Sequence, residues 1–390
     1  MTSRNNLYSW LITISIILAP VNLFFRWLEN KAYLNGLFSD YLLAKIWLAE
    51  IPIVIVLALW ILELIKNKSI NFSKNKIFIF LIAIIFIRQP FAKYSLLAII
   101  SFFRFFELIL FGLFLKEKSK SLNKKLINFS LVFILFFQIF LSNAQFFLQR
   151  NIFDYSVIGE TQLTSSINIA KLNFKQGLLI APYGSMAHPN ILAGFLLIIS
   201  IVILRRIKNN YFGWLIISLV SWTLFLTQSY SAISGMIIFL ILQSHECLKK
   251  KLSYKLFFTG LILIPIGLFL IDQKQEIISV KRRVFLNSQA INIWLKNILL
   301  GTGLNNFIYH LKTKSSSELV RFIQPAHNVI LLMIAEMGLL GATLIFKTRN
   351  WIKNNIPLET LFILLPIMSL DHYFLTQWIG GWLIMVLLFL

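Results

Sequence analysis

The sequence predicts an all-α membrane protein, a polytopic bundle of about twelve transmembrane helices with a large, partly helical extracytoplasmic loop. Three observations support this fold class. Hydrophobic residues make up 58% of the 390 residues, more apolar surface than a soluble domain of this length buries. Long apolar runs recur at lengths that fit a hydrocarbon core of about 30 Å. Basic residues gather in alternate connections between these runs.

Twelve apolar segments are candidates for transmembrane helices, because a segment that crosses lipid must satisfy its own backbone hydrogen bonds. The third, sixth, eighth and eleventh are short. The whole chain, 1–390, is expected to form one integral membrane domain. In order, the segments are 7–25, 42–65, 77–88, 94–115, 126–148, 191–204, 211–226, 232–243, 256–271, 328–346, 357–370 and 374–390.

The net charge of +22 could suggest a nucleic-acid partner, but the positions of the charges indicate membrane topology instead. If the N-terminus is cytoplasmic, 20 of the 37 Lys and Arg lie in short connections on the cytoplasmic side. Such a bias in short loops sets the orientation of membrane helices. We therefore expect a multi-pass protein of a bacterial cytoplasmic membrane, with both termini cytoplasmic and no nucleic-acid partner.

Two long stretches then face the outside, 150–188 and 272–327. Long loops carry function more often than short connections do. Four of the five histidines fall on this side or at its edge, namely His188, His310, His327 and His372. The extracytoplasmic loop 272–327 is expected to carry part of the functional site.

An amphipathic helix is predicted over 284–300 in this loop, because apolar residues recur at three- and four-residue steps. It is too polar to span and is expected to lie in the membrane interface. Arg282 and Arg283 lie at its N-terminal end, and Gly301 and Gly303 end it. These glycines permit a tight turn and the close approach of a ligand or another backbone. The alternative is a surface helix whose arginines contact lipid phosphates.

The predicted helix at 328–346 opens on His327 and Asn328 and carries Gly338 and Gly341. In a continuous helix both glycines point within about 40° of the direction of the imidazole, so that another helix could pack closely there. A histidine at a water-accessible helix mouth can act as a general base. The alternative is a His–Asn pair that caps the first turn.

Two ionisable residues, Arg104 and Glu107, lie within the segment 94–115. Charged groups at such depth often have a function. Because they are three residues apart on one helix, they could instead neutralise each other. We interpret them as a structural ion pair.

Four motifs together resemble the O-antigen ligase and O-antigen polymerase superfamily of bacterial membrane glycosyltransferases. Each is weak alone, but their order and spacing are more specific and cover roughly 180–345. They are Gly184-Ser-Met-Ala-His-Pro-Asn-Ile-Leu-Ala193, Thr227-Gln-Ser-Tyr-Ser-Ala-Ile-Ser-Gly235, Arg283 placed eighteen residues before Gly301-Thr-Gly-Leu-Asn-Asn-Phe307, and His327-Asn328 followed after nine residues by Gly338-Leu-Leu-Gly341.

The resemblance implies transfer of a glycan from an undecaprenyl-pyrophosphate carrier to an acceptor outside the membrane, without a metal or cofactor. Arg283 would hold the donor pyrophosphate, and His327 would deprotonate or orient the acceptor hydroxyl, which predicts inversion. The resemblance and the external loops also suggest substrate-binding residues: Arg282, Arg321, Asn328, Gly301, Gly303, His188, Asn190 and Tyr230.

Tyr230 is a departure from the family, which commonly has an arginine at that position as a second phosphate contact. Arg282, Arg321 or Arg150 could substitute for it, or the donor could be bound differently. The acceptor, whether glycan, lipid or protein, stays open.

Two other functions are compatible with the sequence. A glycosyltransferase using a polyprenyl-phosphate sugar would need an acid in the first external loop, where Glu29 and Asp40 are available. A transporter or flippase of lipid-linked saccharides is the second. Such proteins often show internal repeats, and no repeat is visible in this chain.

Overall fold

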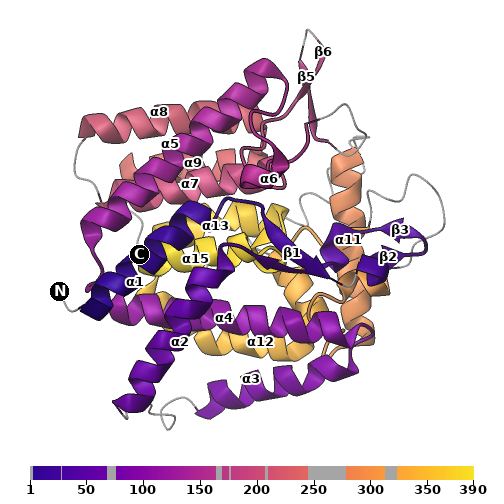
Figure 1. Ribbon diagram of the computed structural model, residues 1–390. Coiled ribbons are helices and arrows are strands. Elements are labelled where there is room, and N and C mark those ends of the chain that lie inside the picture. Colours follow the sequence, from indigo (N-terminus) through magenta and orange to yellow (C-terminus); the bar gives the residue numbers. More distant parts are fainter. Residues whose placement is uncertain are drawn as a thin grey trace.

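The computed structural model describes residues 3–27, 29–67, 76–163, 169–174, 177–206, 210–244, 278–311 and 323–390. Within these ranges the fold is mostly helical (Figure 1). The predicted segment 256–271 and Arg321 lie outside the described residues. Among the described residues, four helical segments are long and apolar enough to cross a membrane, namely α4 (Ser95–Lys118), α5 (Lys124–Leu148), α7 (Pro189–Arg206) and Val329–Lys347 of α12 (Val329–Asn355).

The predicted count of about twelve spans is not confirmed, because the other apolar segments form shorter helices. The first ends at Leu18 instead of residue 25, two residues before Pro20. The shorter helices are α1 (Ser3–Leu18), α2 (Glu50–Lys66), α3 (Lys76–Arg88), α8 (Asn210–Thr227), α9 (Tyr230–Ser244), α13 (Leu358–Leu370) and α15 (Trp378–Phe389), with single turns at η1 (Glu29–Lys31), η2 (Asp40–Leu42), η4 (Gln89–Phe91), α6 (Tyr155–Ile158), η5 (Phe307–His310) and α14 (Tyr373–Thr376).

In the described part of the chain, three small two-stranded antiparallel sheets correct the all-α prediction. β1 (Phe24–Trp27) pairs with β4 (Ala44–Trp47), and β2 (Tyr33–Leu34) pairs with β3 (Leu37–Phe38). β5 (Lys171–Phe174) pairs with β6 (Gly177–Ile180) in the long stretch 150–188. Asn35 and Gly36 both have positive φ between β2 and β3, as a tight hairpin turn requires. Residues 24–27 and 29–47 together form a β cap.

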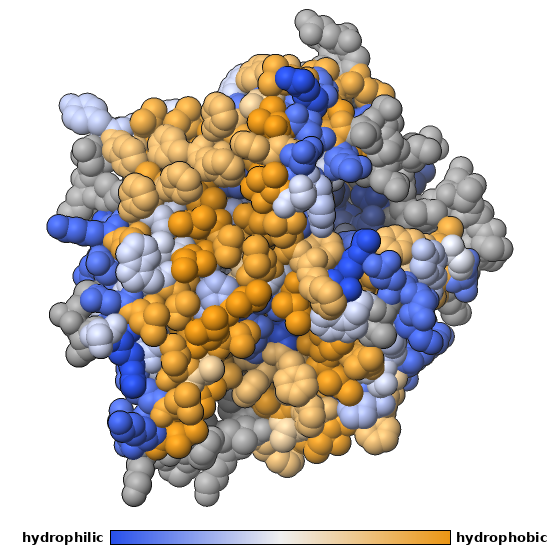
Figure 2. Space-filling model, viewed as in Figure 1, coloured by the Kyte–Doolittle hydropathy of each residue, from blue (hydrophilic) through white to orange (hydrophobic). Residues whose placement is uncertain are grey.

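The buried core is centred on α7, where every residue from Ile191 to Ile203 is buried. Large side chains on α5 face outward instead: Phe129, Phe133, Phe140 and Phe147 are 47–67% exposed. Figure 2 shows a broad hydrophobic face on the molecule. An outward apolar surface of this extent is typical of a protein that sits in lipid. Together with the four long apolar helices, it indicates a membrane protein.

The two ends of the bundle differ (Figure 1). Both chain termini lie at one end, and the β cap and α11 (Ile278–Lys296) lie at the other. The amphipathic helix predicted over 284–300 is present as α11, but it begins six residues earlier and ends four residues earlier, so Arg282 and Arg283 lie within the helix. In Figure 1 α11 runs across the direction of α4 and α12. Leu286, Ala290 and Ile293 are buried on its inner face, in an apolar cluster shared with α12 and the β cap.

The prediction that Arg104 pairs with Glu107 is wrong. Arg104 instead forms an ion pair with Glu50, with Nε 3.4 Å from Oε1. It also donates a hydrogen bond to the Lys45 carbonyl. Glu107 accepts from the indole Nε1 of Trp378 at 3.3 Å. The partners come from other helices because tertiary packing brings α2 and α15 against α4.

Candidate functional site

His327 lies immediately before α12, and its neighbour Asn328 caps that helix. The Asn328 side chain accepts a hydrogen bond from the Leu331 amide at 2.9 Å, as an N-cap residue does. The Nε2 atom of His327 is 3.2 Å from Oε1 of Gln324. If Nε2 carries the proton for that contact, Nδ1 is left with a lone pair. The side chains of His327 and Asn328 are both buried.

Asp371 faces His327 from the end of α13. Its Oδ1 lies 4.0 Å from Nδ1 of His327. The same carboxylate accepts hydrogen bonds from Asn190 Nδ2 at 3.0 Å and from Ser231 Oγ at 2.6 Å. One acid therefore ties the first turns of α7 and α9 to the segment before α14. A buried carboxylate needs such donors to be stable.

His372 extends the cluster. Its ring lies edge-on to the His327 ring, with centroids 4.9 Å apart, and edge-on to Tyr41 of the β cap, with centroids 5.1 Å apart. Its Nδ1 is 2.8 Å from the Thr376 hydroxyl. The site thus receives side chains from the β cap, α12 and the loop between α13 and α14.

The arginine pair of α11 reaches the same place. Arg283 Nε donates to the carbonyl oxygen of Leu370 at 3.2 Å, one residue before Asp371. Arg282 and Arg283 both lie close enough to lower the pKa values of His327 and His372. The structure therefore brings Arg282, Arg283 and His327 together.

The electrostatics of the cluster favour neutral histidines. Burial, then the neighbouring His372 and the charges of Arg283 and Arg282, holds the pKa of His327 well below its usual range. Burial, with His188 and the same arginines, lowers the pKa of His372 to about 3. Burial raises the pKa of Asp371, although Arg283 and its two hydrogen-bond donors act in the opposite direction. At neutral pH both imidazoles can accept a proton.

Two polar atoms at the centre of the cluster are buried without a hydrogen-bond partner among the described residues, Nδ1 of His327 and Nδ2 of Asn328. Buried polar atoms in native proteins are usually satisfied by protein or by bound molecules. A hydroxyl-bearing ligand could satisfy atoms of both kinds, because a hydroxyl both donates and accepts hydrogen bonds.

Gly301 and Gly338 permit the close approach of two backbone segments, whereas Gly303 faces the side chain of Ala92. A Cβ on Gly301 would lie 2.3 Å from the carbonyl carbon of Glu336, and one on Gly338 would lie 2.5 Å from the Leu299 oxygen. Gly338 has φ 61° and ψ −150° and interrupts α12. The expectation that Gly338 and Gly341 share one face of a continuous helix is therefore wrong, because α12 is kinked between His327 and Gly341.

Glu336 of α12 binds the turn that follows α11. Its carboxylate accepts from the amides of Asn305 at 2.9 Å and Phe307 at 3.3 Å. The amides of Thr302 and Gly303 donate to the carbonyls of α12 at 3.1 and 2.9 Å. The turn after α11 is thus held rigidly against the helix that begins at His327.

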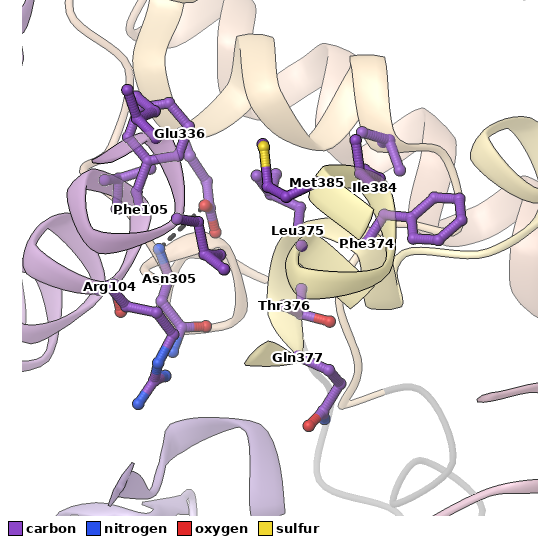
Figure 3. Close-up of a pocket in the computed structure, with 16 residues that line it drawn as sticks. Arg104, Phe105, Asn305, Glu336, Phe374, Leu375, Thr376, Gln377, Ile384 and Met385 are labelled. Atoms are coloured by element: carbon purple, nitrogen blue, oxygen red, sulfur yellow. Dashed lines mark hydrogen bonds between the residues drawn. The ribbon is translucent and has the colours of Figure 1, made fainter. Parts of the chain in front are cut away.

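A cavity of about 180 Å³ borders the cluster (Figure 3). In Figure 3 Arg104, Asn305 and Gln377 lie toward one end, and Ile384 and Met385 lie toward the other. Thr376 lines the cavity and contacts His372. The cavity is therefore polar at one end and apolar at the other. Thr376 lies between the cavity and His372.

Some of the other predicted residues lie in or beside the cluster, and Tyr230 does not. Asn190 joins the cluster through its hydrogen bond to Asp371. The His188 ring accepts a hydrogen bond from the Asn190 amide at 3.1 Å. Desolvation by the surrounding protein, followed by Arg282 and Arg283, lowers the pKa of His188 to about 4, although its ring keeps contact with solvent. Tyr230 is 74% exposed, whereas the adjacent Ser231 contacts Asp371.

The acids considered for the alternative transferase are engaged with cations. Glu29 Oε1 is 2.6 Å from Arg26 Nε, and Asp40 Oδ2 is 2.5 Å from Lys45 Nζ. Lys45 is buried in β4 and not within a span.

Sequence reasoning missed Asp371, Ser231 and Tyr41 as site residues. A signal for Asp371 was present, because the polar pair Asp371-His372 separates the last two apolar segments of the sequence. Tyr41 carried no signal in its spacing. In the part of the chain that the structure describes, no group of three or more His, Cys, Asp or Glu could hold a metal ion.

No protein-family model matches the chain, and no curated protein matches it.

Proposed function

We propose that the protein is a membrane glycosyltransferase of the O-antigen ligase or polymerase type, which moves a glycan from an undecaprenyl-pyrophosphate carrier to an acceptor hydroxyl outside the cytoplasmic membrane. One observation carries this proposal. Arg283 contacts Leu370, and the next residue, Asp371, lies 4.0 Å from His327. The neutral imidazole of His327 and the permanently charged guanidinium of Arg283 thus lie near the same short segment, Leu370 and Asp371.

The chemistry follows from these two groups. His327 Nδ1 takes the proton of the acceptor hydroxyl, and the acceptor oxygen forms a bond to the anomeric carbon. The bond from that carbon to the pyrophosphate oxygen breaks, and its electron pair leaves with undecaprenyl pyrophosphate. Attack opposite the leaving group inverts the anomeric centre. Asp371 stabilises the imidazolium that forms, as a carboxylate beside a catalytic histidine does.

The arginines supply the charge that the leaving group needs. Guanidinium groups bind phosphate oxygens with two parallel hydrogen bonds and keep their charge at all physiological pH values. Arg282 and Arg283 therefore stabilise the pyrophosphate as negative charge develops on it. This mechanism requires no metal or cofactor.

The neighbouring cavity supports a lipid donor. Its apolar end, at Ile384 and Met385, suits part of a hydrocarbon chain, and its polar end lies next to the histidine cluster. The two ends of the bundle support the proposed topology: the termini lie away from the β cap and α11, near which the cluster lies. A bacterial cytoplasmic membrane with both termini inside fits this arrangement.

The experiment uses purified protein in lipid nanodiscs with an undecaprenyl-pyrophosphate-linked glycan and a panel of acceptors: lipid A core, lipid-linked repeat units and membrane proteins. Glycan transfer to one acceptor, lost in Arg283→Ala and His327→Ala, supports the proposal. Arg26→Ala serves as a matched control, because Arg26 pairs with Glu29 on the β cap. In proteoliposomes, translocation of the donor without transfer to any acceptor would identify a flippase and refute the proposal.

A further inference from the structure

Tyr41 of the β cap packs against the histidine cluster. Its ring packs edge-on against His372 at 5.1 Å. The charges of Arg282 and Asp371 both act on its phenol. One side chain from the first external loop is therefore in contact with a cluster otherwise built from later parts of the chain.

The backbone around Tyr41 is held firmly in place. Asn305 Nδ2 donates to the Tyr41 carbonyl at 3.1 Å. Two residues earlier, Ser39 Oγ donates to the Ile323 carbonyl at 3.2 Å. The next residue, Leu42, is fully buried in the apolar cluster shared with α11 and α12. The position of Tyr41 is thus fixed by contacts that do not involve its hydroxyl.

The hydroxyl itself makes no hydrogen bond to another described residue, and the side chain is only half-buried. Burial, followed by the nearby Asp40, raises the pKa of Tyr41, although Arg282 acts in the opposite direction. The phenol therefore keeps its proton at physiological pH and can donate it in a hydrogen bond.

We propose that the Tyr41 hydroxyl donates a hydrogen bond to a pyrophosphate oxygen of the lipid donor, beside the guanidinium of Arg282. This inference rests on the proposed function. It makes Tyr41 a substrate-binding residue and gives the β cap a role in closing the anion site. A neutral phenol beside Arg282 adds a directional donor without adding charge.

Binding of undecaprenyl pyrophosphate to purified protein in nanodiscs tests this role. Tyr41→Phe keeps the ring and its contact with His372 but removes the hydroxyl. We expect about tenfold weaker binding, as for the loss of a hydrogen bond to a charged group, with an unchanged unfolding temperature. Tyr33→Phe is the matched control, because Tyr33 is on the same cap, is 52% exposed and packs on Phe38.

Two outcomes separate the inference from the proposed function. If Tyr41→Phe binds undecaprenyl pyrophosphate as the wild type does while Arg283→Ala binds it weakly, the role of Tyr41 is refuted and the proposed function stands. If the wild-type protein does not bind undecaprenyl pyrophosphate, both are refuted. Equal weakening in Tyr33→Phe and Tyr41→Phe would also refute a specific contact at Tyr41.

Discussion

The Nδ1 atom of His327 lies 4.0 Å from Oδ1 of Asp371, beside the arginine pair of α11. Asp371 is already held by Asn190 and Ser231, whereas Nδ1 of His327 has no hydrogen-bond partner among the described residues. A rigidly held acid therefore faces a buried histidine nitrogen that has no hydrogen-bond partner among the described residues. The predictions for His327 and Asp371 depend on this geometry.

His327→Gln should lower the rate of glycan transfer by about 10²–10⁴-fold, the usual contribution of a general base, while donor binding changes little. The measurement is kcat with a saturating lipid donor. His310→Gln is the matched control, because His310 lies in η5, outside the cluster. Equal rates for the wild type and His327→Gln would exclude the histidine as the base.

Asp371→Asn should lower kcat and also destabilise the protein. The amide cannot stabilise an imidazolium as a carboxylate does, and the site loses one acceptor for Asn190 or Ser231. Each buried donor left unsatisfied costs about 1–3 kcal/mol. Ser231→Ala separates the two effects, since it removes one hydrogen bond and keeps the charge. If both variants lose activity only in proportion to their thermal stability, Asp371 has a structural role alone.

The pH dependence of transfer should differ between the free protein and its donor complex. In the free protein the pKa of His327 lies well below its usual range, partly because of Arg283 and Arg282. Bound pyrophosphate neutralises those charges, so the imidazolium becomes more stable and the pKa rises. The acid limb of kcat, which reports the complex, should therefore lie at higher pH than the acid limb of kcat/KM.

Arg283→Gln supplies the check on this pH effect. Loss of one positive charge should raise the pKa of His327 in the free protein and move the kcat/KM limb to higher pH. Arg26→Gln should leave it in place. If the acid limbs of kcat and kcat/KM coincide in the wild type, the charge of the bound donor does not change the pKa of His327.

Acid should destabilise the fold through His372 and His188. The pKa of His372 is about 3 and that of His188 is about 4 in the folded protein, against about 6.5 in an unfolded chain. Below pH 6.5 the unfolded chain binds protons that the folded protein does not, so stability falls as pH falls toward these folded values. The loss is at most about 1.4 kcal/mol per pH unit for the buried His372.

Thermal unfolding in nanodiscs at pH 7.5 and 5.5 measures this loss. His372→Asn should reduce the difference between the two pH values. A difference as large in His372→Asn as in the wild type would assign the acid sensitivity to other groups.

Gly338→Ala should destabilise the protein more than Gly36→Ala does. Both glycines have positive φ, so both substitutions strain the backbone. A Cβ on Gly338 would meet backbone atoms of Leu299 and Gly301 at 2.5–2.6 Å, whereas one on Gly36 would meet nothing within 4 Å. Strain alone costs about 1–2 kcal/mol, and only Gly338→Ala also separates α12 from the turn. Equal unfolding temperatures for the two variants would contradict this account.

The sequence predicted most helices and part of the cluster. Apolar runs anticipated α4, α5, α7 and α12, because length and hydropathy are local properties of the chain. The same reasoning anticipated α11 and its arginines. It missed the strands of the β cap, since residues 42–47 are apolar enough to be taken as the start of a span.

Pairing between distant residues could not be predicted in this way. Arg104 was assigned to Glu107 because they are close on one helix, yet packing places Glu50 nearer to it. The spacing of Gly338 and Gly341 assumed a straight helix, and the docked turn at Gly301 instead occupies the kink.

By itself the sequence determined a membrane-embedded, mostly helical chain and drew attention to Arg283 and His327. Only the tertiary structure decided that Asp371, Ser231 and Tyr41 lie beside these residues. The physical reason is that apolar periodicity records which parts of the chain avoid water, a property each segment has alone. Which buried polar groups satisfy one another depends on how the helices pack, and that is settled by the whole chain at once.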